Sequence, residues 1–202
     1  MQEPLERMTT KTKAALRKEL RAVRREHAAA QPDHIRALLF HTPPRPLLAK
    51  LDPHAVIGLY HATAHEAPTA GYMRHFHENR HTIALPRFAT EETPMEFAQH
   101  SDPFAESDLE PGPFGLVQPG RHASALAPDV LFVPLVGFTP SGKRLGQGGG
   151  HYDRWLAEHP GVLKIGLAWD VQLIEPEAAL PTEPHDVPLD AIVTPTRIYG
   201  TL

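Results

Sequence analysis

The 202-residue sequence contains no cysteine, and this absence excludes disulfides, thiolate zinc sites and cysteine nucleophiles. It also contains no run of about 18 apolar residues and no signal-peptide core, so we expect no membrane association and a cytoplasmic location. The formal net charge of −4 argues against broad nucleic-acid binding. Serine-hydrolase chemistry has no support either, because no G-x-S-x-G motif occurs. The length fits one domain over residues 1–202.

The most distinctive stretch present is glycine-rich and runs from residue 141 to 155, Ser-Gly-Lys-Arg-Leu-Gly-Gln-Gly-Gly-Gly-His-Tyr-Asp-Arg-Trp. Glycines let backbone N–H groups approach an anion closely, and a helix that begins within them adds a partial positive charge. Lys143 and Arg144 can neutralise phosphate, and Asp153 can hold Mg²⁺ or pair with a neighbouring arginine. We interpret this stretch as a candidate nucleotide-phosphate site.

Two common nucleotide motifs are similar to this stretch but fail at a discriminating position. Residues 137–144 resemble a Walker A loop, yet Arg144 stands where Ser or Thr would hold Mg²⁺. Residues 146–150 begin like a dinucleotide fingerprint, but the last glycine of that motif would fall on His151. Neither a P-loop nor a dinucleotide fold is therefore expected.

The pattern of apolar segments predicts an α/β sheet, with ligands outside the carboxyl ends of the strands. The first unit is a strand at 54–60, a loop at 61–67 that contains Glu66, a helix at 69–79 and a strand at 81–85. A helix is also expected from Pro32 to about 41, before a cluster of prolines. Residues 91–128 are expected to be irregular apart from one strand at 95–99. Further elements are expected at 129–136 (strand), 149–158 (helix), 163–169 (strand) and 190–193 (the last strand).

A basic N-terminal helix is predicted over about residues 10–27, with Thr9 or Thr10 as its cap and residues 1–8 disordered. Lys13 and Arg17 lie one turn apart on it, and Arg21 and Arg24 continue nearby. Two interpretations of this basic face remain open: a solvated surface, or an arm that reaches an anionic ligand.

The sequence His77-Glu78-Asn79-Arg80-His81 matches the H-E-x-x-H pattern of zinc hydrolases. A zinc site requires both histidines on one face of a helix, with Glu78 as general base. The predicted elements put His81 at the passage from helix to strand, where that geometry is lost. A zinc hydrolase is kept only as an alternative.

Together these residues make the chain similar to the 5-formyltetrahydrofolate cyclo-ligase (5,10-methenyltetrahydrofolate synthetase) family. Residues 129–156 carry the core of the resemblance, an apolar strand, a Gly-x-Arg-Leu-Gly-x-Gly-x-Gly-x-Tyr-Asp loop and a helix. Supporting matches are Lys13 and Arg17, Glu66-x-x-Thr69, Pro86-Arg87, Gly112-Pro113-Phe114-Gly115 with Gln118-Pro119, and the segment from His185 to Asp190. The family implies a three-layer α/β/α sandwich around a mixed, mostly parallel sheet.

The resemblance also implies the reaction: ATP- and Mg²⁺-dependent cyclisation of 5-formyltetrahydrofolate to 5,10-methenyltetrahydrofolate, with release of ADP and phosphate. The expected ligands are therefore ATP and the formylated folate, with Mg²⁺ as cofactor, and we expect a monomer. The catalytic residues it implies are Arg144 and Lys143, and the metal ligands are Asp153 and Asp190. The implied ATP contacts are Lys13, Arg17, Arg144, Leu145, Gly146, Gln147, Gly148, Gly149, Gly150, His151 and Tyr152. The implied folate contacts are Glu66, His61, Phe114, Gln147, Gly148, Gly149, Gly150 and His151.

The chain departs from the family pattern mainly on the folate side. His151 replaces the first of two adjacent tyrosines, His65 stands where glycine is frequent, and Pro68 stands where an acidic residue is frequent. His61 occupies a position that is commonly apolar. A nucleotide- or folate-binding protein without turnover is therefore the main alternative function.

Overall fold

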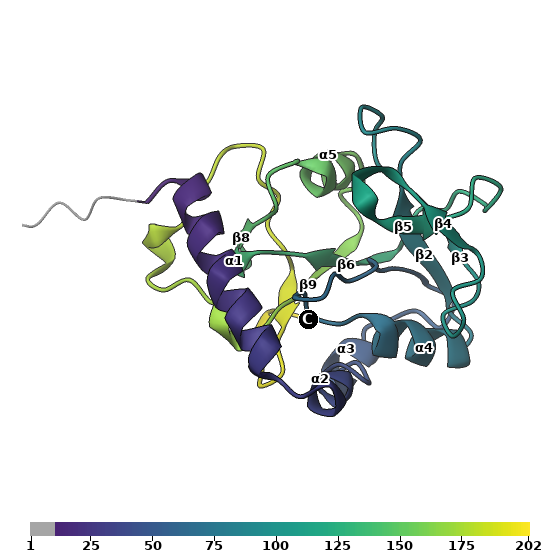
Figure 1. Ribbon diagram of the computed structural model, residues 1–202, viewed down its shortest axis with the longest axis horizontal. Coiled ribbons are helices and arrows are strands. Elements are labelled where there is room, and N and C mark those ends of the chain that lie inside the picture. Colours follow the sequence, from purple (N-terminus) through teal and green to yellow (C-terminus); the bar gives the residue numbers. More distant parts are fainter. Residues whose placement is uncertain (1–10) are drawn as a thin grey trace, which may run out of the picture.

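A seven-stranded sheet forms the centre of the chain in the computed structural model, which describes residues 11–202 (Figure 1). The α-helices are α1 (Lys13–Ala30), α2 (Asp33–Leu39), α3 (Arg45–Leu48), α4 (Ala70–Glu78) and α5 (His151–Glu158). The strands are β1 (Val56–Gly58), β2 (Thr82–Arg87), β3 (Glu96–His100), β4 (Leu109–Pro111), β5 (Val117–Pro119), β6 (Val130–Pro134), β7 (Gly137–Phe138), β8 (Arg144–Leu145), β9 (Leu163–Leu167), β10 (Ala191–Val193) and β11 (Ile198–Gly200). Three short 3-10 helices are η1 (Pro113–Gly115), η2 (Asp170–Gln172) and η3 (Glu177–Ala179).

The strand order in this sheet is β11-β10-β9-β6-β1-β2-β3. The five central strands pair in parallel, whereas β3 and β11 pair antiparallel at the two edges. The carboxyl ends of β1, β2 and β6 therefore lie at one edge of the sheet, where ligands of open α/β sheets bind. The prediction of a mixed, mostly parallel sheet is confirmed.

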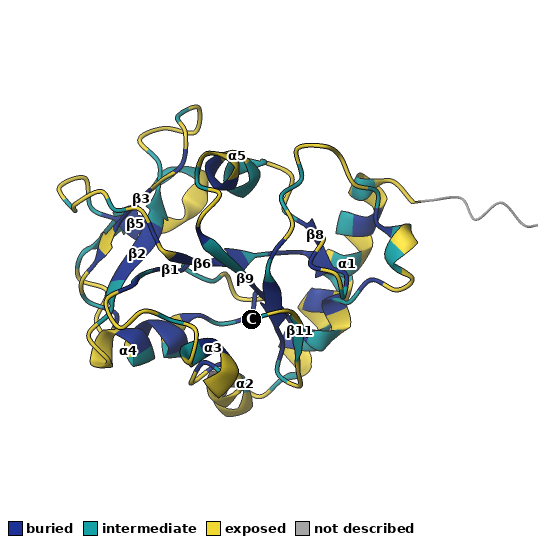
Figure 2. Ribbon diagram, turned by 180° about the vertical axis from the view of Figure 1, so that it is seen from behind, coloured by how far each residue is buried: buried dark blue, intermediate teal, exposed yellow. Residues whose placement is uncertain are grey.

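Strand β6 shows how the sheet is covered on both faces. Side chains alternate along a strand: Phe132 packs with the α3 and α4 residues Leu47 and Tyr72, while Val133 packs with Trp155 of α5. In Figure 1, α2, α3 and α4 lie below the sheet and α5 lies above it. Figure 2 shows the central strands buried and α2 largely exposed. These are the three layers of the predicted α/β/α sandwich.

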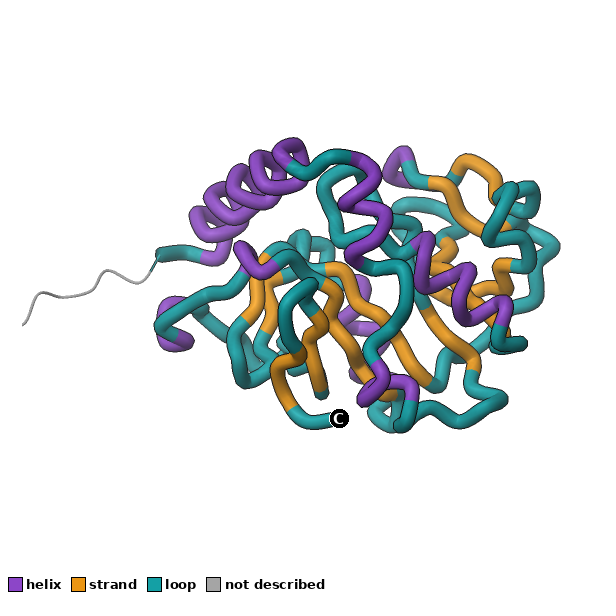
Figure 3. Tube along the Cα trace, turned by 90° about the horizontal axis from the view of Figure 1, so that it is seen from below, coloured by secondary structure: helices purple, strands orange, loops and turns teal. Residues whose placement is uncertain are grey.

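Helix α1 lies outside those two helical layers, across one end of the molecule (Figures 1 and 3). The Thr12 side chain caps it by accepting a hydrogen bond from the Ala15 N–H. The helix runs to Ala30, one turn further than predicted, and the expected caps Thr9 and Thr10 lie outside the described residues, as does the segment 1–8 that is expected to be disordered. Its Leu16 packs on Leu145 of β8. No helix in residues 11–202 is long and apolar enough to cross a bilayer.

The secondary structure differs from the prediction at three places. Residues 91–128 contain, besides β3, an antiparallel hairpin of β4 and β5 with η1 at its tip. Strand β10 is not the last, because a turn in which the Thr194 N–H donates to the Arg197 carbonyl leads into β11. The helix before the prolines ends at Leu39 as expected, but α3, which was not predicted, forms among them, since Pro46 fits its first turn.

Candidate functional site

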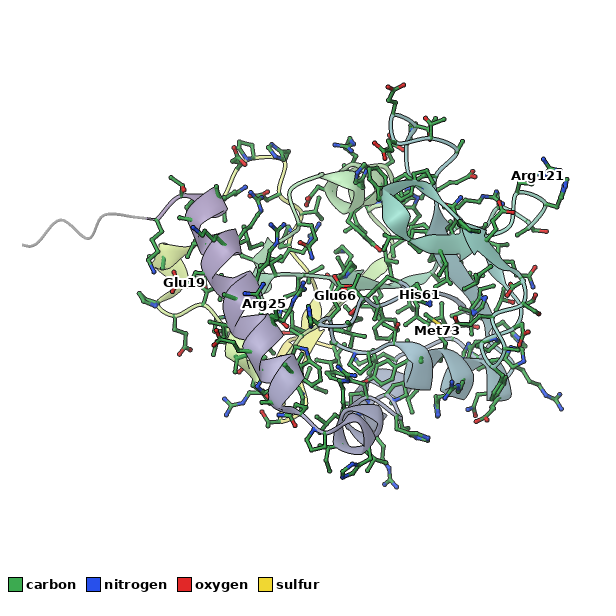
Figure 4. The ribbon with its side chains drawn as sticks, in the orientation of Figure 1. Glu19, Arg25, His61, Glu66, Met73 and Arg121 are labelled. Carbon is green, nitrogen blue, oxygen red and sulfur yellow. The ribbon has the colours of Figure 1, made fainter. Side chains whose placement is uncertain are left out.

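One cavity of about 810 Å³ opens where β1, β2 and β6 end, a volume within the range of small-molecule sites. Figure 4 shows Glu66 and His61 in the middle of the molecule, between α1 on one side and β2 and β3 on the other. We call one part of the cavity wall the ion-pair side (Lys13, Arg17, Arg144, Asp153 and Asp186). We call the other part the aromatic side (Phe88, Phe114, Leu116, Val117 and His151), with Glu66 between the two.

The glycine loop, residues 146–150, lines the cavity and leads directly into α5. Two of its glycines have positive φ angles, 113° at Gly148 and 65° at Gly150, which side chains with a Cβ rarely adopt. Gly150 is the N-cap of α5, so the predicted helix start within the glycines is confirmed. The segment does not form a P-loop, because the residues after Lys143 form strand β8 rather than a helix.

Helix α1 holds the glycine loop through two arginines. Arg17 Nε donates to the Gly146 carbonyl at 2.9 Å. Arg21 Nη2 donates to the Gln147 carbonyl at 2.8 Å, and its Nε donates to Gln147 Oε1 at 3.0 Å. The basic face of the helix therefore reaches the loop, and the interpretation as a purely solvated surface is wrong.

Arg144 is the most deeply buried cation of the ion-pair side, with 7% of its surface exposed. Its Nη2 donates to Asp153 Oδ1 at 2.6 Å, and its Nη1 donates to the Val187 carbonyl. Burial lowers the pKa of the Arg144 guanidinium, and the carboxylates of Asp153 and Asp186 oppose that change. Asp153 Oδ1 also accepts the Val187 N–H at 3.1 Å. Arg144 and Asp153 together therefore fix the segment around Val187 against the cavity.

Lys13 reaches the same side of the cavity from the first turn of α1. Its Nζ lies 2.5 Å from Glu183 Oε2 and 2.7 Å from Asp186 Oδ2. Partial burial lowers the pKa of Lys13, but its hydrogen bonds to Asp186 and Glu183 outweigh burial and raise it. Lys13 is thus a firmly charged ammonium group on the cavity wall.

The expected pair of metal ligands, Asp153 and Asp190, is not brought together in the cavity. Asp190 does not line it; its Oδ2 accepts the Lys164 N–H at 2.8 Å and lies 3.0 Å from Lys164 Nζ, at the start of β9. Asp186, four residues earlier, lines the cavity with Asp153. In the described part of the chain, the one group of three or more acidic or histidine side chains close enough to share a metal ion is Glu183, His185 and Asp186.

Lys143, which was expected to act beside Arg144, lies outside the cavity. Its Nζ pairs with Glu177 Oε1 at 2.8 Å, and 45% of its side chain is exposed. Successive residues of an extended strand point to opposite sides, so two adjacent cations at the start of β8 do not reach the same site.

Glu66 lies on the cavity wall with 9% of its side chain exposed. Its Oε2 accepts hydrogen bonds from the Thr63 N–H and hydroxyl, each at 2.9 Å. Its Oε1 accepts a longer bond from Gln147 Nε2 at 3.3 Å and lies 3.6 Å from Arg24 Nη1. The carboxylate is therefore fixed through one oxygen, while the other is only weakly bonded and can accept from a ligand.

The aromatic side is built on the β4–β5 hairpin. Gln118 of β5 exchanges two hydrogen bonds of 3.0 Å with the Phe88 backbone at the end of β2. This pairing holds η1 over the cavity, where Phe114 has a φ of 62° and a ring that is 46% exposed. The ring centroids of Phe114 and Phe88 lie 5.2 Å apart, an edge-to-face arrangement.

His151 completes the aromatic side, with its ring 5.0 Å from Phe88 and 5.6 Å from Phe114. Arg154 Nη2 lies 3.0 Å from His151 Nδ1. Arginine can only donate, so Nδ1 accepts and the ring proton of the neutral imidazole resides on Nε2. Burial and then the Arg154 charge lower the pKa of His151. His61 also lines the cavity and pairs with Glu106 at 3.3 Å.

The remaining predicted contacts, Leu145, Gly149 and Tyr152, also line the cavity, and burial raises the pKa of Tyr152. Residues 77–81 lie elsewhere. Helix α4 ends at Glu78, and the His81 Nδ1 lies 3.2 Å from the Ala55 carbonyl, so the two histidines do not share a helical face. The geometry of a zinc hydrolase is absent at this motif.

Four residues that contribute to the site were not predicted as contacts, namely Asp186, Arg21, Arg24 and Phe88, although Arg21 and Arg24 were placed on the basic face of the N-terminal helix. Arg21 and Arg24 follow Arg17 at spacings of four and three residues, which place side chains on one helical face. Phe88 directly follows the Pro86-Arg87 pair, and Asp186 lies in the same short segment as Asp190. Each therefore had a signal in the sequence, but no signal distinguished Asp186 from Asp190.

The chain is similar to the 5-formyltetrahydrofolate cyclo-ligase of Escherichia coli (strain K12), with 48% identity over 73 residues, 35% of this chain and 38% of that protein. The enzyme of the same name from Haemophilus influenzae is 39% identical over 90 residues, 42% of this chain and 46% of that protein. The chain thus spans less than half the length of either of these relatives.

Solved structures are similar over nearly the whole chain. The NMR structure of Aquifex aeolicus 5,10-methenyltetrahydrofolate synthetase has a TM-score of 0.72 at 24% identity and covers 93% of this chain and 92% of that one. The 5,10-methenyltetrahydrofolate synthetase from Mycoplasma pneumoniae has a TM-score of 0.64 at 23% identity, with coverages of 90% and 98%. At such identities the likeness establishes the fold. The family model of 5-formyltetrahydrofolate cyclo-ligases matches residues 9–195, and the chain therefore belongs to the 5-formyltetrahydrofolate cyclo-ligase family.

Proposed function

We propose that the chain catalyses the ATP- and Mg²⁺-dependent cyclisation of 5-formyltetrahydrofolate to 5,10-methenyltetrahydrofolate, with release of ADP and phosphate. The observation that carries the proposal is the cavity itself. An ion-pair side suited to phosphate and an aromatic side suited to a flat heterocycle meet across Glu66 and the glycine loop in one volume. Membership of the family supports the assignment of those two sides to ATP and to the folate.

The ion-pair side would hold the triphosphate. Lys13, Arg17 and Arg144 supply positive charge, and the N–H groups of the glycine loop and of the first turn of α5 supply donors. Phosphoryl transfer requires mainly positioning and charge neutralisation, so these groups suffice without a protein nucleophile.

Mg²⁺ is the metal that the reaction implies, and the residues present fit it. Asp153 and Asp186 are carboxylates on the cavity wall, beside the cations that would bind phosphate. Mg²⁺ is typically held by one or two carboxylates together with phosphate oxygens. We therefore propose Asp153 and Asp186 as its ligands, in place of the pair Asp153 and Asp190. When bound, the ion would neutralise charge on the triphosphate.

The proposed chemistry has two steps, which the family resemblance implies. The formyl oxygen attacks the γ-phosphorus of ATP, the new O–P bond forms, and the bond to the bridging oxygen breaks to release ADP. N10 attacks the formyl carbon and loses its proton as the ring closes, and phosphate leaves with the former formyl oxygen. Glu66 would accept the N–H edge of the pterin, and the rings of Phe114 and Phe88 would cover its apolar faces.

The test is an assay of the purified chain with 5-formyltetrahydrofolate, ATP and Mg²⁺. We expect the methenyl chromophore to accumulate only when all three are present. The altered residues His151 and His65 favour the alternative of a binding protein without turnover, which predicts tight binding of both ligands and no ADP. Folded protein that gives neither chromophore nor ADP contradicts the proposal. Cytoplasmic location and a monomeric state stay predictions.

A further inference from the structure

Arg24 of α1 is buried, with 8% of its side chain exposed, although it carries a charge. Its Nη1 donates to the Leu135 carbonyl at 3.2 Å, and its Nε has no hydrogen-bond partner within residues 11–202. A guanidinium has five N–H donors, and burying one with so few bonds is costly. Packing alone does not account for an arginine at this position.

The charge that faces Arg24 is Glu66, whose Oε1 lies 3.6 Å from Nη1 and whose side chain is equally buried. Burial lowers the pKa of Arg24, and the Glu66 carboxylate raises it. Glu66 lines the cavity but Arg24 does not, so the arginine supports the carboxylate from behind the cavity wall. Figure 4 shows Glu66 beside the middle of α1, the helix that carries Arg24.

The two neighbours of Glu66 Oε1 differ in whether a ligand can displace them. Gln147 reaches it from the glycine loop through a long bond of 3.3 Å, and Gln147 itself lines the cavity. An N–H donor of a ligand can take that place. Arg24 lies outside the cavity and would remain in contact with the carboxylate after the exchange.

We propose that Arg24 is a positioning residue for the folate: from behind the cavity wall it holds the buried Glu66 carboxylate in the orientation in which Oε1 accepts the pterin N–H edge. The inference rests on the proposed function. Without Arg24, the Glu66 carboxylate would lose the ion pair that faces it in residues 11–202, and Oε1 would be a less well-placed acceptor. The loss should therefore fall on the folate and leave ATP binding largely intact.

The first test compares Arg24→Met with Arg25→Met, its exposed neighbour on the helix. We expect Arg24→Met to raise the calorimetric Kd and the KM for 5-formyltetrahydrofolate about 10- to 100-fold. The KM for ATP should change by less than about threefold. Arg24→Lys keeps the charge but loses the planar fork, so its folate-specific loss should be intermediate. Arg25→Met should match the wild type.

A double-mutant cycle with Glu66→Gln separates positioning from general packing. In the Glu66→Gln background, Arg24→Met or Arg24→Lys should add less than about a threefold loss of folate affinity. Equal losses in both backgrounds, or equal losses for ATP and folate, would overturn the proposal. If Arg24→Met does not fold, the same cycle with Arg24→Lys decides. A wild-type protein that binds folate and ATP but does not cyclise contradicts the proposed function instead, and leaves the affinity cycle valid.

Discussion

The two sides of the cavity differ in the number and the pairing of their charged side chains. On the ion-pair side two of the three cations are already paired with carboxylates: Arg144 binds Asp153, and Lys13 binds Asp186 and Glu183. The aromatic side offers rings and aliphatic groups around the single carboxylate of Glu66. An anion that binds on the ion-pair side must therefore compete with protein carboxylates for Arg144 and Lys13. Binding on the aromatic side depends instead on burial and on one oriented acceptor, Glu66.

This difference suggests what a divalent ion contributes in the proposed reaction. A cation bound by Asp153 and Asp186 would neutralise the carboxylates that hold Arg144 and Lys13, and would leave both side chains available to phosphate. The ion-pair side should therefore depend on Mg²⁺ and on ionic strength, and the aromatic side should depend little on either.

The largest expected effect separates two adjacent cations on the ion-pair side. Arg144→Met should lower kcat/KM about 100- to 1,000-fold, because in the proposed reaction it removes the most deeply buried cation from the side of the cavity that would hold the triphosphate. Lys143→Met should change it less than about threefold, since that amine pairs with Glu177 outside the cavity. Steady-state kinetics of both variants provide the measurement.

Thermal unfolding of these two variants is the necessary companion measurement. Arg144 is buried and hydrogen-bonded to the protein, so Arg144→Met should also lower the melting temperature. Replacing an exposed loop residue would leave the melting temperature unchanged. Equal kinetic losses in the two variants would break the distinction between the ion-pair side and its surroundings.

The next effect should appear on the other side of the cavity. Glu66→Gln keeps the size of the side chain but removes its charge, so the KM for 5-formyltetrahydrofolate should rise about 10- to 100-fold. The KM for ATP should stay within about threefold of the wild type. A rise that is shared equally by both substrates would show that the two sides do not act separately.

A smaller effect distinguishes two aspartates in one segment. Asp186→Asn should raise the Mg²⁺ concentration for half-maximal activity at least about tenfold, comparable with the loss of a partner at other metal sites. Asp190→Asn should leave it unchanged, because that carboxylate pairs with Lys164 away from the cavity. Magnesium titrations of the two variants compare them directly, and a reversed order would restore Asp190 as the ligand.

The smallest effect concerns pH on the aromatic side. Burial and Arg154 lower the pKa of His151, so the ring is neutral at neutral pH and gains charge only on acidification. A protonated ring would direct an Nδ1–H at the donor of Arg154. We expect the wild-type KM for the folate to rise a few-fold as the pH falls below the ordinary histidine pKa of about 6.5. His151→Phe should lack that part of the rise, and identical pH profiles would exclude a role for His151.

The strands and the glycine loop could be predicted because hydrophobic alternation and glycine spacing are local signals. The β6 strand, the start of α5 and the position of Glu66 after β1 all follow from them. Strand β11 was not predicted, because its three residues are stabilised only by pairing with β10. Tertiary pairing of this kind leaves little trace in a short segment.

The errors within the site have the same physical origin. Lys143 and Arg144 are adjacent in sequence, and only the register of the β7–β8 hairpin determines which one enters the cavity. Asp186 and Asp190 lie in one segment. Arg144 binds the carbonyl of Val187, the residue next to Asp186, and this contact between distant parts of the sequence could not be predicted. The burial of Arg24 could not be predicted, because it depends on Glu66 and Leu135, which lie far away in sequence.

The central claim is that one cavity joins ATP and the formylated folate in a single reaction. The most direct measurement is the ratio of ADP released to methenyl product formed by the wild-type protein, with both followed in the same reaction mixture. The account predicts one ADP for each methenyl group and none when the folate is omitted. ADP released without product, or product formed without ATP, would contradict it.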